Sequence, residues 1–269
     1  MPKVSISLNG VDLIDAVPSA IIHALSVEPA AVKSQYSELA KGGRLRQSFL
    51  RQSLSVRLEV QFRTIGNPVK RAEAVDALNA WAMGGGKLTI SNRPGKCLYV
   101  ECEKPASEGS LYASDAVASV VLTANAVPFW QAETPTTAET SYMHQGELLA
   151  SMNMPGTTDT EMSAEIIVGD GPLYNLTVST PESYMTFAGE TVTNEDGTTE
   201  QKPLAEADTA FKIIYENGVL KILSGEISAF RFRSAESADD LILSPGENMV
   251  HITADAPVTV KLSACGRWV

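Results

Sequence analysis

The residue types that carry out chemistry are few in this sequence and lie far apart. The three histidines, His23, His144 and His251, belong to no HxxxH or HExxH arrangement. Zinc and di-metal sites need ligands at such spacings, so the sequence predicts no metal site. Asp239 and Asp240 offer adjacent carboxylates for a cation, but their Ser- and Ala-rich surroundings are typical of a solvated turn. No catalytic set can be assembled, and we predict a protein that is not an enzyme and has no cofactor.

The three cysteines are Cys97, Cys102 and Cys265, and none belongs to a CxxC pair. An odd number of cysteines behind a start without an apolar secretory stretch argues against a disulfide framework. We therefore expect free thiols and synthesis in a cytoplasm. No apolar run reaches the roughly 18 residues that span a bilayer, so no membrane partner is predicted.

Gly84-Gly85-Gly86-Lys87 has the composition of a phosphate-binding loop. Such a loop leads from a strand into the amino end of a helix, where backbone N–H groups point at the anion. Here the glycines follow a helical pattern and precede a strand, so they are interpreted as a helix stop.

Residues 41–71 contain eight basic residues against one acidic residue, Glu59. Three interpretations remain open, namely nucleic-acid binding, a solvated strand face and loop, and a subunit contact in which the cations meet a neighbour's carboxylates. Aromatic residues are sparse, with only Phe49 and Phe62 inside the stretch. No sequence-specific nucleic-acid contact is predicted.

The net charge of −11 is distributed unevenly along the 269 residues. Up to Glu133 there are fourteen basic and twelve acidic residues, whereas from Thr134 onward there are seven basic and twenty acidic ones. Such asymmetry indicates two domains, which we place at residues 1–133 and 134–269.

In the first domain, residues 54–62 alternate apolar and polar side chains, as in a strand with one buried face. Residues 67–83 predict the one convincing helix, capped by Asn67 and Pro68 and ended by the glycines. Further strands are predicted at 4–8, 21–27, 87–91, 96–103 and 116–124. Residues 34–47, which include Gly42-Gly43, are interpreted as a mobile loop.

Residues 134–151 are rich in Thr, Ala and Ser and are interpreted as a linker or crossover. Beyond them, many short apolar segments alternate with turns and no helix is evident, a pattern typical of a β-sandwich. Residues 193–203 are expected to form an exposed loop, and Asn217-Gly218 marks a hairpin turn. Strands are predicted at 165–168, 173–178, 184–187, 211–215, 219–223, 227–232, 241–243, 249–252 and 258–262. The predicted fold class is therefore mostly β with one helix. The N-terminal domain is a β-barrel or sandwich that includes the helix, and the C-terminal domain is a β-sandwich.

The order of these features resembles the distal tail proteins of siphophages. The first half matches in the helix that ends near Trp81, the strand-turn-strand through Asn92-Arg93-Pro94-Gly95, and the closing Pro128-Phe129 pair. The second half matches in the segment from Leu243 to Asn248, an L-x-P-G-x-N pattern. The resemblance covers nearly the whole chain and rests on order and spacing more than on any one motif.

This resemblance implies a structural protein of a phage or prophage tail, located in the virion and made in the host cytoplasm. Members of the family form a hexameric ring that joins the tail tube protein to a tail tip or tail-associated lysin protein, and DNA passes through the ring. By analogy residues 1–133 form the ring, and residues 134–269 form a galectin-like sandwich that points outward. The alternatives are another phage structural part and a carbohydrate- or host-receptor-binding module, although Trp268 and scattered tyrosines are the only aromatic sugar platforms in the second half.

Overall fold

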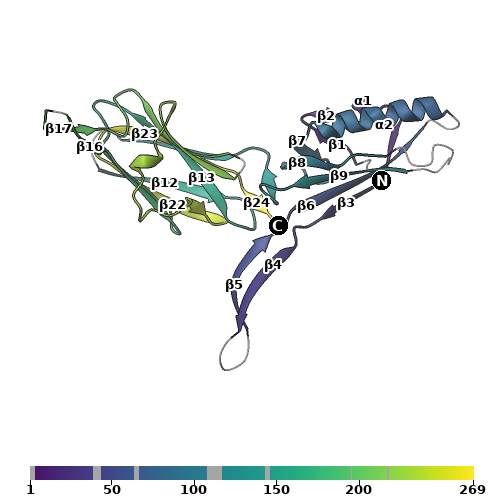
Figure 1. Ribbon diagram of the computed structural model, residues 1–269, viewed down its shortest axis with the longest axis horizontal. Helices are drawn as coiled ribbons and strands as arrows, with labels where there is room; N and C mark the ends of the chain where they lie inside the picture. The colour runs from purple at the N-terminus through teal and green to yellow at the C-terminus, as the bar shows by residue number, and fades with distance from the viewer. Residues whose placement is uncertain are drawn as a thin grey trace. The chain divides into compact units, whose positions relative to one another are not determined.

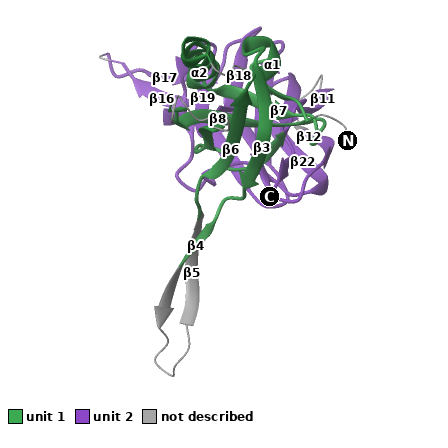
Figure 2. Cartoon of the chain, turned by 90° about the vertical axis from the view of Figure 1, so that its right-hand side faces the viewer, with its two compact units in different colours: residues 1–131, 269 green, residues 132–268 purple. Residues whose placement is uncertain are grey.

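The computed structural model describes residues 4–38, 44–63, 67–107, 117–142, 146–194, 196–216 and 218–269, with the backbone alone for residues 35–38, 44–50, 142 and 146. The chain divides into two compact units. Unit 1 contains residues 1–131 and 269, and unit 2 contains residues 132–268 (Figure 2). The division falls between Gln131 and Ala132, whereas the charge pattern placed it between Glu133 and Thr134.

Unit 1 consists of an antiparallel sheet and one long helix (Figure 1). Its elements are β1 (Ile6–Leu8), β2 (Val11–Asp12), α1 (Leu13–Ala16), β3 (Ala20–Glu28), β4 (Val32–Glu38), β5 (Arg44–Arg51), β6 (Leu54–Phe62), α2 (Pro68–Met83), β7 (Gly86–Ile90), β8 (Lys96–Lys104), β9 (Val117–Ala124) and β10 (Trp130–Ala132). Neighbouring strands follow the order β2-β1-β7-β8-β9-β6-β3. Among the described residues no pairing joins β2 to β3, so the sheet is open and is not closed into a barrel.

Strand β6 lies between β9 and the edge strand β3 and has the predicted burial pattern. Its alternate side chains Leu54, Val56, Leu58, Val60 and Phe62 are all buried. The strand pairs with β3 on one side and with β9 on the other, so its backbone groups are satisfied while one face packs on the core. The predicted half-buried strand is confirmed.

Helix α2 begins and ends where the sequence predicts. The Asn67 side chain accepts a hydrogen bond from the Lys70 backbone N–H at 3.1 Å, and Pro68 occupies the first turn. The buried stripe is Arg71, Ala74, Val75, Leu78, Trp81 and Ala82. Val69 is 65% exposed, because it lies in the first turn, ahead of the stripe that packs on the unit.

The glycines after α2 have a structural role, and Asn9 shares it. Gly85 and Gly86 have positive φ angles, and a Cβ on Gly86 would lie 2.2 Å from the Asn9 Oδ1 atom. The Asn9 amide donates to the Gly85 carbonyl at 2.7 Å, and its oxygen accepts from the Lys87 N–H at 2.9 Å. The tight turn between β1 and β2 is thereby fastened to the end of α2.

Replacing Asn9 with Ala is expected to lower the free energy of unfolding by about 1–2 kcal/mol, because the Gly85 carbonyl and the Lys87 N–H lose their partner. Asn9 also has a φ of 52°, which Asn tolerates better than Ala does. Urea unfolding followed by circular dichroism measures the change. The control is Asn125→Ala, since the Asn125 amide donates to the exposed Glu101 carboxylate at 3.1 Å. Equal losses in both variants would contradict the interpretation.

Unit 2 is a sandwich of two antiparallel sheets around a single core. The larger sheet has the order β11-β23-β13-β18-β19-β20, with β21 beside β13, and the smaller has the order β12-β22-β14-β15. The larger sheet contains β11 (Thr136–Tyr142), β13 (Thr160–Val168), β18 (Ala210–Glu216), β19 (Val219–Ser224), β20 (Ile227–Ser228), β21 (Ile242–Leu243) and β23 (Val258–Ala264). The smaller contains β12 (Gly146–Met154), β14 (Asn175–Ser179), β15 (Tyr184–Ala188) and β22 (Gly246–Ala254). Phe187 on β15 and Phe211 on β18 meet in the core with ring centroids 5.0 Å apart, so the two sheets face each other.

The remaining elements of unit 2 lie outside the two sheets. They are the hairpin strands β16 (Glu190–Thr193) and β17 (Thr199–Lys202), the 3-10 helix η1 (Phe230–Phe232) and β24 (Arg267–Trp268). The mostly β fold class is confirmed by both units, and the galectin-like identity of the sandwich stays a prediction.

Four segments differ from the predictions. Residues 34–38 and 44–47 lie in the paired strands β4 and β5, and the rest of the expected loop, with Gly42-Gly43, lies outside the described residues. The supposed linker contains β11 and β12, and the supposed loop at 193–203 contains the turn and second strand of the β16–β17 hairpin. The strand at 227–232 is only β20 followed by η1. The short helix α1 was not predicted, because four residues carry too little periodicity to recognise.

Candidate functional site

The two described histidines lie on strands of different units. His23 lies at an irregularity of β3 and His251 on β22, while His144 is outside the described residues. Burial raises the pKa of the Cys102 thiol, which disfavours the nucleophilic thiolate form. Within the described ranges, no group of three or more His, Cys, Asp or Glu side chains could hold a metal ion.

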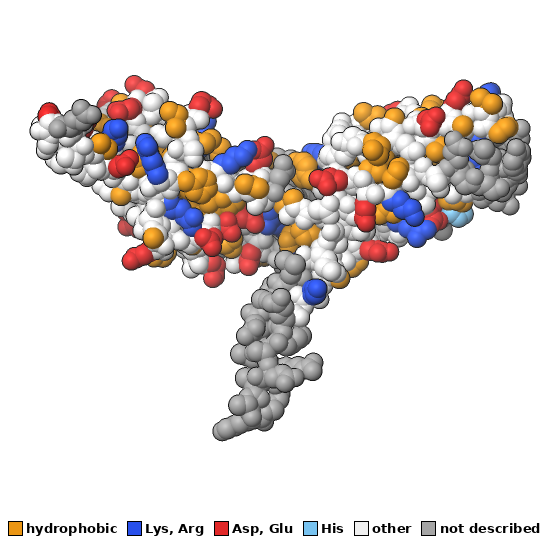
Figure 3. All heavy atoms as spheres, viewed as in Figure 1, with side chains coloured by type: hydrophobic (Ala, Val, Ile, Leu, Met, Phe, Trp, Pro, Cys, Tyr) orange, Lys and Arg blue, Asp and Glu red, His pale blue; other side chains and the backbone are white. Residues whose placement is uncertain are grey.

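The basic stretch does not form a single patch among the described side chains. Arg57 is exposed and pairs with Glu59 at 3.1 Å on the same face of β6. The Arg51 guanidinium lies 5.1 Å from the centre of the Phe129 ring, and Arg71 is buried in α2. On the face drawn in Figure 3, acidic and basic side chains are interspersed on both units. These contacts favour the solvated-face interpretation for β6 and leave the strands β4 and β5 for the subunit-contact interpretation.

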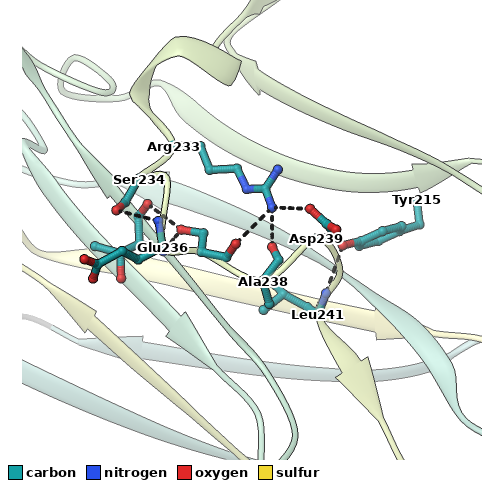
Figure 4. A network of polar contacts seen from close by, with 9 residues as sticks. Tyr215, Arg233, Ser234, Glu236, Ala238, Asp239 and Leu241 are labelled. Carbon is teal, nitrogen blue, oxygen red and sulfur yellow. Dashed lines mark hydrogen bonds and ion pairs between the residues drawn. The ribbon is translucent and has the colours of Figure 1, made fainter. Parts of the chain in front are cut away.

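Asp239 and Asp240 belong to a polar network that closes the segment after η1 (Figure 4). Arg233 donates to the Ala238 carbonyl and, at 3.2 Å, to the Asp239 carboxylate. The Tyr215 hydroxyl accepts from the Leu241 N–H at 2.9 Å. Burial raises the pKa of Tyr215 well above its ordinary value, so this hydroxyl keeps its proton. The two carboxylates are therefore parts of a turn, and the cation interpretation gains no support.

The same segment covers the outer edge of β15. The Ser234 N–H donates to the Thr186 carbonyl at 2.9 Å, and the Ala238 N–H donates to the Tyr184 carbonyl at the same distance. Ser237 adds a side-chain contact to the Thr186 N–H at 2.9 Å. The unpaired backbone groups of an edge strand attract other chains, and this turn satisfies part of them within the unit.

Burial and the Glu161 carboxylate raise the pKa of Asp240 above its ordinary value. Ionising this group costs more in the folded than in the unfolded protein, so stability falls as the pH rises through its folded pKa. Asp240→Asn is expected to raise the free energy of unfolding at neutral pH by at most about 1 kcal/mol, since partial exposure screens the repulsion. Below both pKa values it should change nothing.

Urea unfolding at acid and at neutral pH measures this difference, with Asp239→Asn as the matched control. Asp239 is exposed and faces the Arg233 guanidinium, so its replacement should not stabilise the protein. A loss of stability at neutral pH on replacing Asp240 would show that its charge is favourable and would overturn the assignment.

The outward face of the smaller sheet carries a group of charged, polar and aromatic side chains. His251 on β22 contacts the Glu147 carboxylate on β12 at 2.6 Å, and both side chains are about half exposed. Leu149 and Ser179 lie beside His251 in the register, and Tyr184 follows Ser179 on β15 with 45% exposure. The sequence reasoning missed this grouping, because its members lie on strands far apart in the chain.

No protein-family model and no curated protein sequence matches the chain. Among solved structures, the Dit (gp 19.1) protein of SPP1, described as a paradigm of the hub adsorption apparatus in phages that infect Gram-positive bacteria, matches with a TM-score of 0.61. The alignment covers 97% of this chain and 98% of the SPP1 chain at 13% identity. The chain has the fold of the SPP1 Dit protein.

The match to SPP1 Dit spans both units, so their order along the chain is shared. A chain in the activated baseplate of phage P2 with Ca is also similar, with a TM-score of 0.48, 9% identity and coverage of 98% and 97% of the two chains. The likeness to SPP1 Dit confirms the fold that the resemblance to distal tail proteins implied. No described helix is long and apolar enough to cross a membrane.

Proposed function

We propose that the chain is a structural, non-enzymatic protein of a bacteriophage or prophage tail. It acts as a distal tail protein, a hexameric ring that joins the tail tube protein to a tail tip or tail-associated lysin protein and lets DNA pass. The observation that carries this proposal is the end-to-end likeness to the SPP1 Dit fold in both units. Its location is the virion tail, after synthesis in the host cytoplasm.

Unit 1 is the ring-forming part in this proposal. Strand β3 is nine residues long and pairs only with β6 among the described residues. A long strand with one free edge is a template for pairing with another chain, which is how a ring of identical subunits can close. The acidic second half points outward, where its like charge keeps neighbouring copies apart.

The assembly is tested with the purified full-length chain. Light scattering gives the mass in solution, and negative-stain images show the shape. We expect a six-fold ring with a central hole. A protein that stays monomeric at high concentration, with no ring in any image, overturns the proposal.

Saccharide or host-receptor binding by a galectin-like unit 2 is the second candidate. The grouping of Tyr184, His251 and Glu147 favours it, because an aromatic ring can cover an apolar sugar face while imidazole and carboxylate bond its hydroxyls. The Thr177 and Thr186 hydroxyls, 3.2 Å apart, continue this surface. A glycan array probed with the full-length chain tests the idea, and binding should be lost in Tyr184→Ala. Silence on the array removes this candidate.

A further inference from the structure

The outward face of the smaller sheet of unit 2 presents its side chains in rows that cross the four strands β12-β22-β14-β15. Residues that are paired in the register lie side by side on the same face of a sheet. The first row, with one residue from each strand in that order, contains Leu149, His251, Ser179 and Tyr184. The second row contains Glu147, Thr253, Thr177 and Thr186. Adjacent strands are about 4.8 Å apart, so each row is about 14 Å long.

The first row has an apolar group at each end and polar groups between them. Leu149 on β12 is 55% exposed, and Tyr184 on β15 is 45% exposed. His251 lies between them and contacts the Glu147 carboxylate of the second row at 2.6 Å. The other three residues of the second row are threonines. Apolar surfaces that can cover sugar rings are therefore placed beside donors and acceptors for hydroxyl groups, the combination that a saccharide requires.

The charge of this face distinguishes between classes of glycan. The outward residues of the four strands are Glu147, Leu149, Ser151, Asn153, Asn175, Thr177, Ser179, Tyr184, Thr186, Ala188, Glu247, Met249, His251 and Thr253. None of them is Lys or Arg, the residues that bind phosphate and carboxylate groups most strongly. His251 is the member that can carry a positive charge, and it is already paired with Glu147. Glu147 and Glu247 would repel an anionic polymer, so the face fits an uncharged glycan.

We propose that unit 2 binds a linear, uncharged oligosaccharide that lies across the strands of its smaller sheet. The inference rests on the saccharide candidate of the proposed function and adds the class of the ligand, its length and its direction on the sheet. Tyr184 and Leu149 cover sugar rings at the two ends of the row, and the polar residues between them bond the hydroxyls. A row of about 14 Å exceeds one sugar ring, so a monosaccharide does not reach both ends. The paired strands hold these positions before the ligand arrives, which limits the entropy lost on binding.

Glycan binding by the full-length chain tests the inference. Fluorescence polarisation compares labelled mono-, tri- and hexasaccharides of glucose, galactose and N-acetylglucosamine with labelled poly(glycerol phosphate), an anionic polymer. We expect at least one neutral series to bind, with the hexasaccharide bound about tenfold more tightly than the monosaccharide because it reaches both apolar ends. Poly(glycerol phosphate) should not bind.

Substitutions at the two ends of the first row locate the bound chain. Tyr184→Ala and Leu149→Ala should each weaken hexasaccharide binding about tenfold and remove the advantage of length. Tyr184→Phe should keep most of the affinity, because the ring remains. The matched controls are Tyr99→Ala in unit 1 and Val219→Ala on β19, whose side chains are 48% and 58% exposed. They should leave binding unchanged, and circular dichroism checks that every variant is folded.

Equal effects of the Tyr184 and Tyr99 variants, or an affinity that does not grow with length, overturn the assignment to this row. Binding of poly(glycerol phosphate) alone overturns the uncharged class and leaves a host-receptor role for unit 2 intact. If no probe binds, the inference and the saccharide candidate fail together. The ring proposal is judged from negative-stain images of the same protein and does not depend on these results.

Discussion

Replacing Glu161 with Gln is expected to lower the free energy of unfolding by about 3 kcal/mol, because it removes the Glu161 carboxylate from a mostly buried ion pair with the Arg267 guanidinium. The two side chains are 22% and 11% exposed. Arg267 donates to Glu161 at 2.9 Å through Nη1 and makes a second, closer contact through Nη2. A two-pronged pair of this kind is stronger and more directional than a single ionic contact.

The pair matters because it holds the C-terminal segment against β13. The Arg267 carbonyl accepts from the Thr157 N–H at 2.8 Å, and the Cys265 carbonyl accepts from the Thr160 hydroxyl at the same distance. Gly156 packs so closely on this segment that a Cβ there would lie 2.4 Å from the Arg267 carbonyl oxygen. Loss of the ion pair therefore loosens a segment whose backbone contacts depend on close approach.

Urea unfolding at neutral pH measures the effect, with Glu165→Gln as the matched control. Glu165 lies on the same strand and pairs with Lys212 at 3.2 Å, but its side chain is 39% exposed. Its replacement should cost less than about 1 kcal/mol, as for other exposed pairs. Equal losses at the two positions would mean that burial of the Glu161–Arg267 pair has no energetic consequence. The Glu161 variant should also lower the pKa of Asp240 toward its ordinary value, because one cause of its rise is removed.

Periodicity predicted the elements whose two faces differ. Residues 54–62 alternate cleanly because one face of β6 packs on the core, and α2 is bounded by a capping Asn and by glycines. β12 follows the same rule, since Leu148, Ala150, Met152 and Met154 are buried in alternation. It was missed because small and hydroxyl side chains dominate the segment around it and resemble a linker in composition.

Periodicity could not predict the β16–β17 hairpin, and the reason is different. None of the described side chains of this hairpin is buried, so its sequence has no apolar period to detect. The hairpin strands β16 and β17 consist almost entirely of exposed polar residues. Likewise, the approach of His251 to Glu147 depends on the pairing of β22 with β12, about a hundred residues apart, and local patterns carry no such information.

The L-x-P-G-x-N segment shows how a weak motif acquires a physical role. By sequence it is only a turn, yet Asn248 is 2% exposed and its side chain fills that turn. Its oxygen accepts from the Ser244 N–H at 3.1 Å, and its amide donates to the Ser244 carbonyl at 2.8 Å and the Gly246 carbonyl at 2.9 Å. The side chain therefore satisfies backbone groups on both sides of the turn that leads into β22.

Asn248→Ala is expected to cost about 3–4 kcal/mol, because several buried backbone groups lose their partners at once. Urea unfolding measures the loss, and Asn153→Ala, at an exposed position of the neighbouring strand β12, should change stability by less than about 0.5 kcal/mol. Asn248→Asp separates the two roles of the amide, since a carboxylate keeps the acceptor but cannot donate to the two carbonyls. At neutral pH it should therefore destabilise at least as much as Ala, and part of the loss should be recovered in acid, where the protonated carboxyl donates once. An Asp variant as stable as the unchanged protein would show that the donated bonds to Ser244 and Gly246 do not hold the turn.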